Sequence, residues 1–236
     1  MKYLIALFLG LSVGAAILVI ALIYNPFNAT AGLSPLSVSN SELITLSFSG
    51  VPSEAIMFTN DGESRLKPFP EKVQQLWEAP VRLSSMMVTA MRDARGGTAG
   101  IGIKFSSLSE STRLLQGEAM VDSAWYIYLP GRGSLFIEQT ENHWQFVRDV
   151  MVPAYRSSAN SWKGTWIGDL TAGPGALRTA AATGGAGSLQ GLKMEAVESL
   201  LAQAYSLESG PVAAEGRLLI ELPRNLQEFE GGSSGE

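Results

Sequence analysis

The side chains best able to do chemistry are few and scattered along the chain. The 236 residues include a single histidine, His143, and no cysteine. This composition excludes disulfides, cysteine nucleophiles, thiolate metal sites and, within one chain, a metal centre built from several histidines. Any enzyme would have to use scattered carboxylates such as Asp122, Glu138, Asp149 and Asp169. A glycosidase-like pair would need two of them about 5–10 Å apart in a cleft.

The lone histidine lies in the segment Glu141-Asn-His143-Trp144. A catalytic histidine needs a positioned acid and a nucleophile. Asp149 and Asp169 could approach it in space, but no Gly-x-Ser-x-Gly nucleophile elbow occurs in the sequence. We therefore interpret His143 as a partly exposed residue of a loop or strand end.

Two short motifs have the spacing of a site but the wrong context. Ser64-Arg-Leu-Lys67 has the Ser-x-x-Lys spacing in which a serine opens a helix, yet Pro68 follows the lysine directly. The glycines at 97, 100 and 102 resemble a phosphate loop, but the sequence continues as a strand through Ile101–Phe105 rather than as a helix. We find no catalytic, cofactor or metal motif, and expect a protein that is not an enzyme.

Aromatic residues concentrate between positions 125 and 166. One interpretation is a β-sheet core with aromatic cross-strand pairs. The other is a binding surface for a partner protein, a glycan or the membrane interface, and both stay open. The candidate residues of such a surface are Trp125, Tyr128, Trp144, Trp162 and Trp166.

The N-terminus is the strongest location signal, because the first charged residue after Lys2 is Glu42. Residues 3–24 are almost wholly apolar, and as a helix they would span roughly 33 Å, enough for a bilayer core. We expect a transmembrane anchor over 1–24 and a neutral linker over 25–41. The alternative is a long signal peptide that is cleaved after Ala31.

The predicted anchor has consequences for topology and for partners. Lys2 and the amino terminus would stay in the cytoplasm, so in a bacterium the chain would sit in the inner membrane with its bulk in the periplasm. Gly10, Ser12 and Gly14 form a GxxxG-like face that could pack against another membrane helix.

Beyond the linker, alternating patterns predict a β-rich domain over 42–223 and a flexible tail over 224–236. The predicted fold class is α+β: a transmembrane helix followed by a mostly antiparallel sheet with one or two packed helices. Residues 171–191 are expected to form a long mobile loop. The expected helices are 71–79 and 188–207, and the expected strands are 43–48, 55–59, 81–92, 101–105, 114–121, 124–129, 134–139, 143–152, 161–170 and 212–222.

The charge pattern excludes one class of function. Seventeen basic and 22 acidic residues give a net charge of −5, and the basic residues form no stripe that could bind nucleic acid. With an anchor and no evident chemistry, we expect a non-catalytic single-pass accessory or assembly subunit that binds membrane or envelope proteins. The alternative is a periplasmic protein that binds a lipid or another hydrophobic, amphiphilic ligand.

Overall fold

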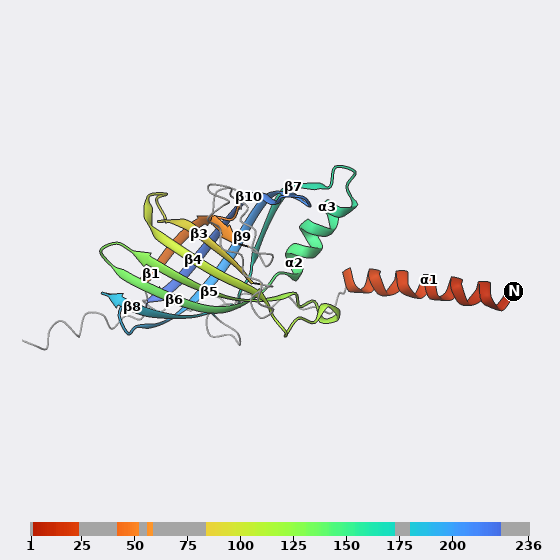
Figure 1. Ribbon diagram of the computed structural model, residues 1–236, viewed down its shortest axis with the longest axis horizontal. Helices are drawn as coiled ribbons and strands as arrows, with labels where there is room; N and C mark the ends of the chain where they lie inside the picture. Colours follow the sequence, from red (N-terminus) through yellow and green to blue (C-terminus); the bar gives the residue numbers. More distant parts are fainter. Residues whose placement is uncertain (1, 24–41, 52–55, 59–83, 173–179, 223–236) are drawn as a thin grey trace, which may run out of the picture.

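The computed structural model describes residues 2–23, 42–51, 56–58, 84–172 and 180–222, and they form one antiparallel sheet with a few helical segments (Figure 1). The strands are β1 (Glu42–Ser49), β2 (Ile56–Phe58), β3 (Ser84–Arg92), β4 (Thr98–Leu108), β5 (Met120–Leu129), β6 (Gly133–Asn142), β7 (Ser161–Asp169), β8 (Ala180–Gly187), β9 (Lys193–Ser206) and β10 (Gly210–Leu222). The helical segments are α1 (Lys2–Ile23), the 3₁₀ turn η4 (Leu114–Gln116) and the consecutive α2 (Trp144–Phe146), π-helical η5 (Val147–Met151) and α3 (Val152–Arg156).

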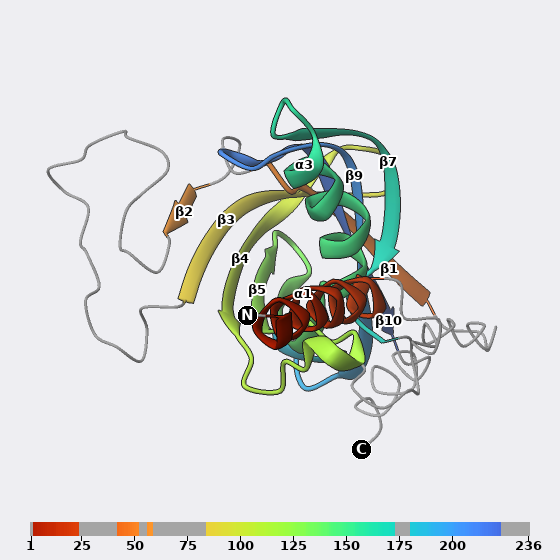
Figure 2. The same cartoon turned by 90° about the vertical axis from the view of Figure 1, so that its right-hand side faces the viewer.

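The sheet closes on itself. Its strand order is β1-β10-β9-β8-β6-β5-β4-β3-β2, and β1 also pairs with β3 where Ser47 lies opposite Arg92. Eight strands therefore form a ring, which we call the barrel and which is seen from one end in Figure 2. β2 and β7 lie outside this ring, paired with β3 and β9 respectively.

β9 changes partner along its length. Its first part pairs with β8, where Ala196 lies opposite Ala180, and its later part pairs with β7, where Ser199 lies opposite Asp169. Glu198 thus lies at the point where the partner of β9 changes from β8 to β7, which we call the fork in β9. On the far side of the fork, the backbone N–H of Asn142 donates to the carbonyl of Leu170 at 2.7 Å and ties the end of β6 to the end of β7.

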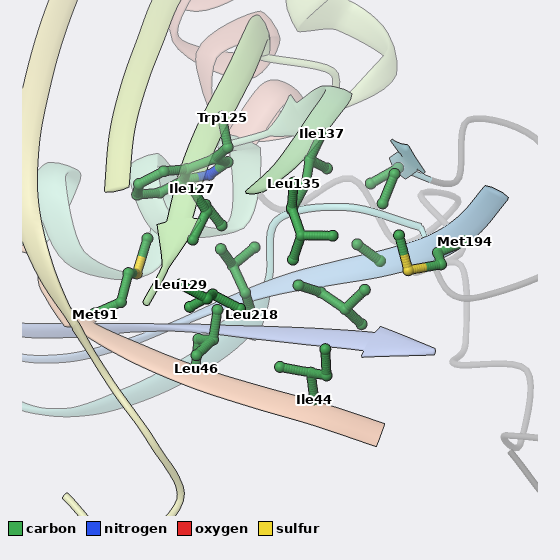
Figure 3. Packing of buried hydrophobic residues seen from close by; sticks show 14 of the residues in the cluster. Ile44, Leu46, Met91, Trp125, Ile127, Leu129, Leu135, Ile137, Met194 and Leu218 are labelled. Carbon is green, nitrogen blue, oxygen red and sulfur yellow. The ribbon is translucent and has the colours of Figure 1, made fainter. Parts of the chain in front are cut away.

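The main hydrophobic core fills the barrel because successive strand residues point alternately inward and outward. Trp125 is fully buried, and its ring meets that of Phe48 edge-on at 4.8 Å between centroids. A Cβ on Gly102 would lie 2.2 Å from Met91 Cε, so only glycine allows β4 to approach these side chains. The buried members, several of which Figure 3 labels, are Ile44, Leu46, Phe48, Met91, Trp125, Ile127, Leu129, Leu135, Ile137, Ala180, Ala182, Leu189, Met194, Ala196, Leu218, Ile220 and Leu222.

A second, smaller core lies outside the barrel, between the helical segment 144–156 and strands β7 and β9. The ring of Phe146 meets those of Trp166 and Tyr205 edge-on, at 5.2 and 5.7 Å between centroids. Val150 and Ala154 lie on the same side of the helical segment and are fully buried. This packing fixes the helical segment that leaves the end of β6.

Residues 2–23 are helical, as expected, and α1 extends away from the barrel (Figures 1 and 2). Among the described residues, no helix meets the requirements of length and apolar character for spanning a bilayer. The prediction of a transmembrane helix, and with it the predicted fold class, is therefore wrong. Gly10, Ser12 and Gly14 lie on α1, and a Cβ at either glycine would meet no atom within 4 Å.

The fold is also more completely β than the sequence indicated. The expected helix at 188–207 is the strand β9, because hydrogen bonds to three neighbouring strands outweigh a helix-like apolar stripe. Part of the expected loop at 171–191 is β8, whose small residues allow close packing: a Cβ on Gly184 would lie 1.5 Å from the carbonyl oxygen of Leu189.

Two further expected strands are helical in whole or in part. Residues 144–152 lie in the α2–η5–α3 segment, where Phe146, Val150 and Ala154 have the spacing of one buried helix face. Residues 114–116 form the turn η4, and β5 begins only at Met120.

The remaining strand predictions are confirmed, including the β3–β4 and β5–β6 hairpins. The predicted linker 25–41, the possible cleavage site at Ala31, the helix at 71–79 and the tail 224–236 lie outside the described residues.

Candidate active site

Polar side chains replace apolar ones at one level of the barrel interior. In β6, Leu135 and Ile137 point inward and are buried, and the next inward positions are Gln139 and Glu141. A period of two places all four on the same face of the strand. Both polar residues are nearly as buried as the apolar ones, at 6% and 1% exposed. The inward face of β6 therefore carries an amide and a carboxylate into the core.

The neighbouring strands add polar groups at the same level. Lys104 on β4 lies directly opposite Trp125 on β5, and Ser123 on β5 lies opposite Gln139 on β6. Glu198 comes from the fork in β9 and is 2% exposed. We call these six residues, Lys104, Ser123, Trp125, Gln139, Glu141 and Glu198, the polar cluster.

A lysine bridged by two carboxylates is at the centre of the polar cluster. Lys104 Nζ lies 2.7 Å from Glu141 Oε1 and 2.7 Å from Glu198 Oε1. The same nitrogen lies 5.4 Å from the centroid of the Trp125 ring. One lysine against two glutamates leaves the ionised cluster with an excess charge of 1 − 2 = −1.

Neutral donors complete the shell around the two carboxylates. Trp125 Nε1 donates to Glu198 Oε2 at 2.9 Å. Gln139 Nε2 donates to Glu141 Oε1 at 3.0 Å and also to Glu198 Oε2. The Ser123 hydroxyl donates to Glu141 Oε1. Each carboxylate is thus held by at least three side chains, which fixes its orientation.

The fork in β9 fixes the backbone under Glu198. The Glu198 N–H donates to Thr171 Oγ1 at 2.9 Å, and the Glu198 carbonyl accepts from the N–H of Leu170 at 2.8 Å. Leu170 and Thr171 are the two residues that follow the end of β7. The strand that leaves the barrel therefore positions a carboxylate inside it.

The electrostatics of the polar cluster favour the charged forms of Lys104 and Glu141. Burial opposes charge on both groups, but their mutual attraction is larger in sum. Against burial, the coulombic attraction of Glu141 and Glu198 and their hydrogen bonds raise the pKa of Lys104. Burial alone would raise the pKa of Glu141, yet Lys104 and the hydrogen bond from His143 hold it well below the usual range. Glu141 is consequently an ionised acceptor.

His143 connects the polar cluster to the surface. Its Nε2 lies 2.7 Å from Glu141 Oε2, and its side chain is 28% exposed. The backbone N–H of His143 donates to the Ala119 carbonyl at 2.8 Å, and the His143 carbonyl accepts from the N–H of Val147 at 2.9 Å. These bonds hold the imidazole at the point where β6 gives way to α2.

The charge of Glu141 decides the tautomer of the histidine. An ionised carboxylate can only accept, so the neutral imidazole must carry its proton on Nε2. Nδ1 is then a free acceptor, with no hydrogen-bond partner among the described residues. A histidine held in one tautomer by a buried carboxylate is one arrangement that supports general acid–base catalysis. In the described part of the chain, no group of three or more acidic or imidazole side chains could hold a metal ion.

The five aromatic residues predicted as a binding surface lie in different places. Trp125 is buried in the polar cluster, whereas Tyr128 points outward from the same strand and is about half exposed. Trp144 begins α2, and Trp162 and Trp166 pack against the second core. The structure thus brings only Trp162 and Trp166 together, and binding by these residues stays a prediction.

The scattered carboxylates named from the sequence do not meet in one site. Asp122 accepts from Thr140 Oγ1 on the outer face of the sheet, and Glu138 is exposed. Asp149 forms a two-bond pair with the neighbouring Arg148, at 2.7 and 2.8 Å. Asp169 stands apart, and partial burial raises its pKa.

The polar cluster itself was not predicted, although a signal for it exists in the sequence. Counting in twos from Leu135 along one strand reaches Gln139 and Glu141 on the buried face. Glu141 is also only two positions from His143, but Asp149 and Asp169 were considered as its acid instead. Glu198 falls within the segment 188–207 that the sequence predicts to be a helix, so its inward position on a strand could not be predicted.

Comparison with known proteins gives only distant similarity. No family model and no curated protein matches the sequence. Among solved structures, the chain is similar to the Diels–Alderase AbmU from Streptomyces koyangensis, with 10% identity and a TM-score of 0.38 over 86% of this chain and 80% of that one. It is also similar to a nonspecific heme-binding cyclase of neoabyssomicin biosynthesis, with 9% identity and a TM-score of 0.36. That match covers 79% of this chain and 66% of the cyclase, just under two thirds.

The structure contradicts the expected function. The prediction of a non-catalytic single-pass accessory subunit is wrong, because no helix of the described residues can span a membrane. The predicted inner-membrane location and the predicted membrane and envelope partners depended on the same anchor and are withdrawn with it. The periplasmic setting of the alternative, a lipid-binding or amphiphile-binding protein, rested on that segment too.

Proposed function

We propose that the protein is an enzyme that catalyses proton transfer on a small organic substrate at the Glu141–His143 pair. The observation that carries this proposal is the 2.7 Å contact between His143 Nε2 and the buried Glu141 Oε2. His143 is the general acid–base, and Glu141 is a positioning residue that fixes its tautomer.

The burial of the polar cluster supports a functional role. A buried ion pair adds little to stability, and replacing it by apolar side chains of similar volume is often neutral or stabilising. The barrel nevertheless buries two carboxylates and a lysine beside a well-packed core. Strongly perturbed titratable groups that gather around a specific charge partner are typical of functional sites.

The same geometry indicates the type of reaction. In the described structure no serine or threonine hydroxyl bonds to His143, so the pair is built to move a proton rather than to activate a nucleophile. Reactions of this type include isomerisation and proton abstraction next to a carbonyl group. Lys104 and the donors around it keep Glu141 ionised while the histidine gains and loses its proton.

The proposal can be tested by following carbon-bound hydrogens in heavy water. A panel of small ketones, lactones and amides is incubated with the protein in D₂O, and exchange next to the carbonyl group is recorded by proton NMR. We expect at least one compound to exchange faster with the protein than without it. His143→Gln should slow this exchange by about 10²–10⁴-fold.

A matched variant separates chemistry from folding. Gln145→Asn changes a half-buried neighbour of the histidine that forms no hydrogen bond with the polar cluster and should leave the exchange rate unchanged. Exchange that is equally fast with the wild type and with a folded His143→Gln variant would rule out the assigned role. So would a panel in which the protein accelerates no compound.

A further inference from the structure

Inside the barrel, the amide nitrogen of Gln139 has hydrogen-bond partners but the amide oxygen has none among the described residues. Its Nε2 donates to two carboxylates, Glu141 and Glu198, and the side chain is more than nine-tenths buried. Carboxylate oxygens accept hydrogen bonds, so they fix which end of the amide is the nitrogen. Gln139 Oε1 must therefore point away from both carboxylates.

This oxygen has no hydrogen-bond partner among the described residues. A buried acceptor without a donor is unfavourable and is uncommon in folded proteins. In the observed arrangement the donors of the polar cluster bond to carboxylates instead: Lys104 and Ser123 bond to Glu141, and Trp125 bonds to Glu198. The missing donor has to come from something other than the polar cluster.

The charge of the polar cluster limits what this donor can belong to. With His143 neutral, the ionised cluster carries an excess of one negative charge. Lys104, the only buried cation among the described residues, is already shared between two carboxylates. An anionic ligand would add a third negative charge in a region of low polarity, where charges interact strongly. A neutral or cationic donor would meet no such repulsion.

We propose that the ligand of this site presents an O–H or N–H group to Gln139 Oε1 and carries no negative charge at that end. This inference rests on the proposed function, because it defines the substrate class of the same site. Gln139 is thereby a specificity-determining residue: it accepts a hydrogen bond from the donor group of the ligand, while His143 transfers the proton and Glu141 orients His143. The substrate class is small neutral or cationic molecules with a hydroxyl, amide or amine group.

Three probes of similar shape test this inference. Benzyl alcohol has a neutral donor, benzyl methyl ether lacks the donor, and benzoate replaces it with a negative charge. Binding is followed through the indole N–H resonance of Trp125, which bonds to Glu198 beside the amide. We expect the alcohol to bind roughly tenfold more tightly than the ether, the effect of one hydrogen bond, and benzoate to bind most weakly.

Variants assign the preference to Gln139. Gln139→Met removes the acceptor at similar volume and should reduce the difference between alcohol and ether to within about twofold. Gln190→Met, at an exposed glutamine, should leave it unchanged. The comparison of the three probes on the wild type stands even if Gln139→Met does not fold.

The outcomes distinguish this inference from the proposed function. If alcohol and ether bind equally, as they would if a trapped water satisfied Gln139 Oε1, the inference is overturned while the site itself stands. Tightest binding of benzoate, or a preference that persists in a folded Gln139→Met variant, would also overturn it. If no probe perturbs Trp125, the interior does not admit a ligand, and both the inference and the proposed function are contradicted.

Discussion

The two halves of the barrel interior are built from the same strands but obey different physical rules. In one half, side chains such as Ile127, Leu135 and Leu218 are fully buried, and their contribution follows from the apolar area removed from water. In the other half, Lys104, Glu141 and Glu198 are buried almost as deeply, but desolvation opposes their burial. The apolar half stabilises the fold, and the polar half holds the groups that we propose transfer the proton.

The largest effect should come from breaking the charge balance of the polar half. Lys104→Met leaves two carboxylates buried beside each other without their cation, and we expect a loss of about 3–5 kcal/mol in the free energy of unfolding. Urea unfolding measures this loss. The control is Lys163→Met at an exposed position, with a change within about 0.5 kcal/mol. A loss below about 1 kcal/mol for Lys104→Met would contradict the buried ion pairs.

A cavity in the apolar half should have a slightly smaller effect. Leu135→Ala removes a fully buried side chain from the core and should lower the free energy of unfolding by about 2–5 kcal/mol. Ile167→Ala, at an exposed position of β7, should change it by less than about 0.5 kcal/mol. Equal effects in the two variants would show that Leu135 is not packed as described.

Neutralising the whole polar half should be better tolerated than breaking it. A triple variant, Lys104→Met with Glu141→Gln and Glu198→Gln, removes all three charges and keeps the volumes similar. We expect stability near that of the wild type, or higher by about 1–4 kcal/mol, together with loss of the exchange activity. Thermal unfolding and the heavy-water assay measure the two properties. A triple variant less stable than Lys104→Met would mean that the charges themselves stabilise the fold.

The smallest effect concerns pH and acts on the polar half alone. The folded-state pKa of Glu141 lies below its ordinary value of about 4.5, so its contribution to stability is complete above that pH. It is lost as the pH falls toward the folded-state value. Urea unfolding between pH 6 and pH 3 should therefore show a steeper decline for the wild type than for Glu141→Gln. Parallel declines would contradict the lowered pKa.

The positions of the strands could be predicted from the sequence more fully than the polar cluster that those strands carry. Alternation correctly located the β3–β4 and β5–β6 hairpins, because those strands have one buried and one exposed face. The same rule failed for β9, whose residues also fit a helical stripe until pairing with β7, β8 and β10 decides between the two. It failed for β8 too, since a run of alanine and glycine lacks a hydrophobic pattern.

The site was harder to predict because its members meet only in three dimensions. Lys104 and Glu198 are 94 positions apart, and nothing local in the sequence connects them. Their contact depends on closure of the sheet and on the fork in β9. His143 and Glu141 were visible together in the sequence, but choosing Glu141 as the acid required knowing that β6 ends between them and turns the histidine back toward it.

The most direct test of the account is the ¹⁵N NMR spectrum of the imidazole, which needs no assignment because His143 is the only histidine. The account predicts that the neutral ring carries its proton on Nε2, that Nδ1 is unprotonated, and that Glu141→Gln weakens this preference. A neutral ring with its proton mainly on Nδ1, or a spectrum unchanged by Glu141→Gln, would contradict the claim that a buried carboxylate prepares this histidine for proton transfer.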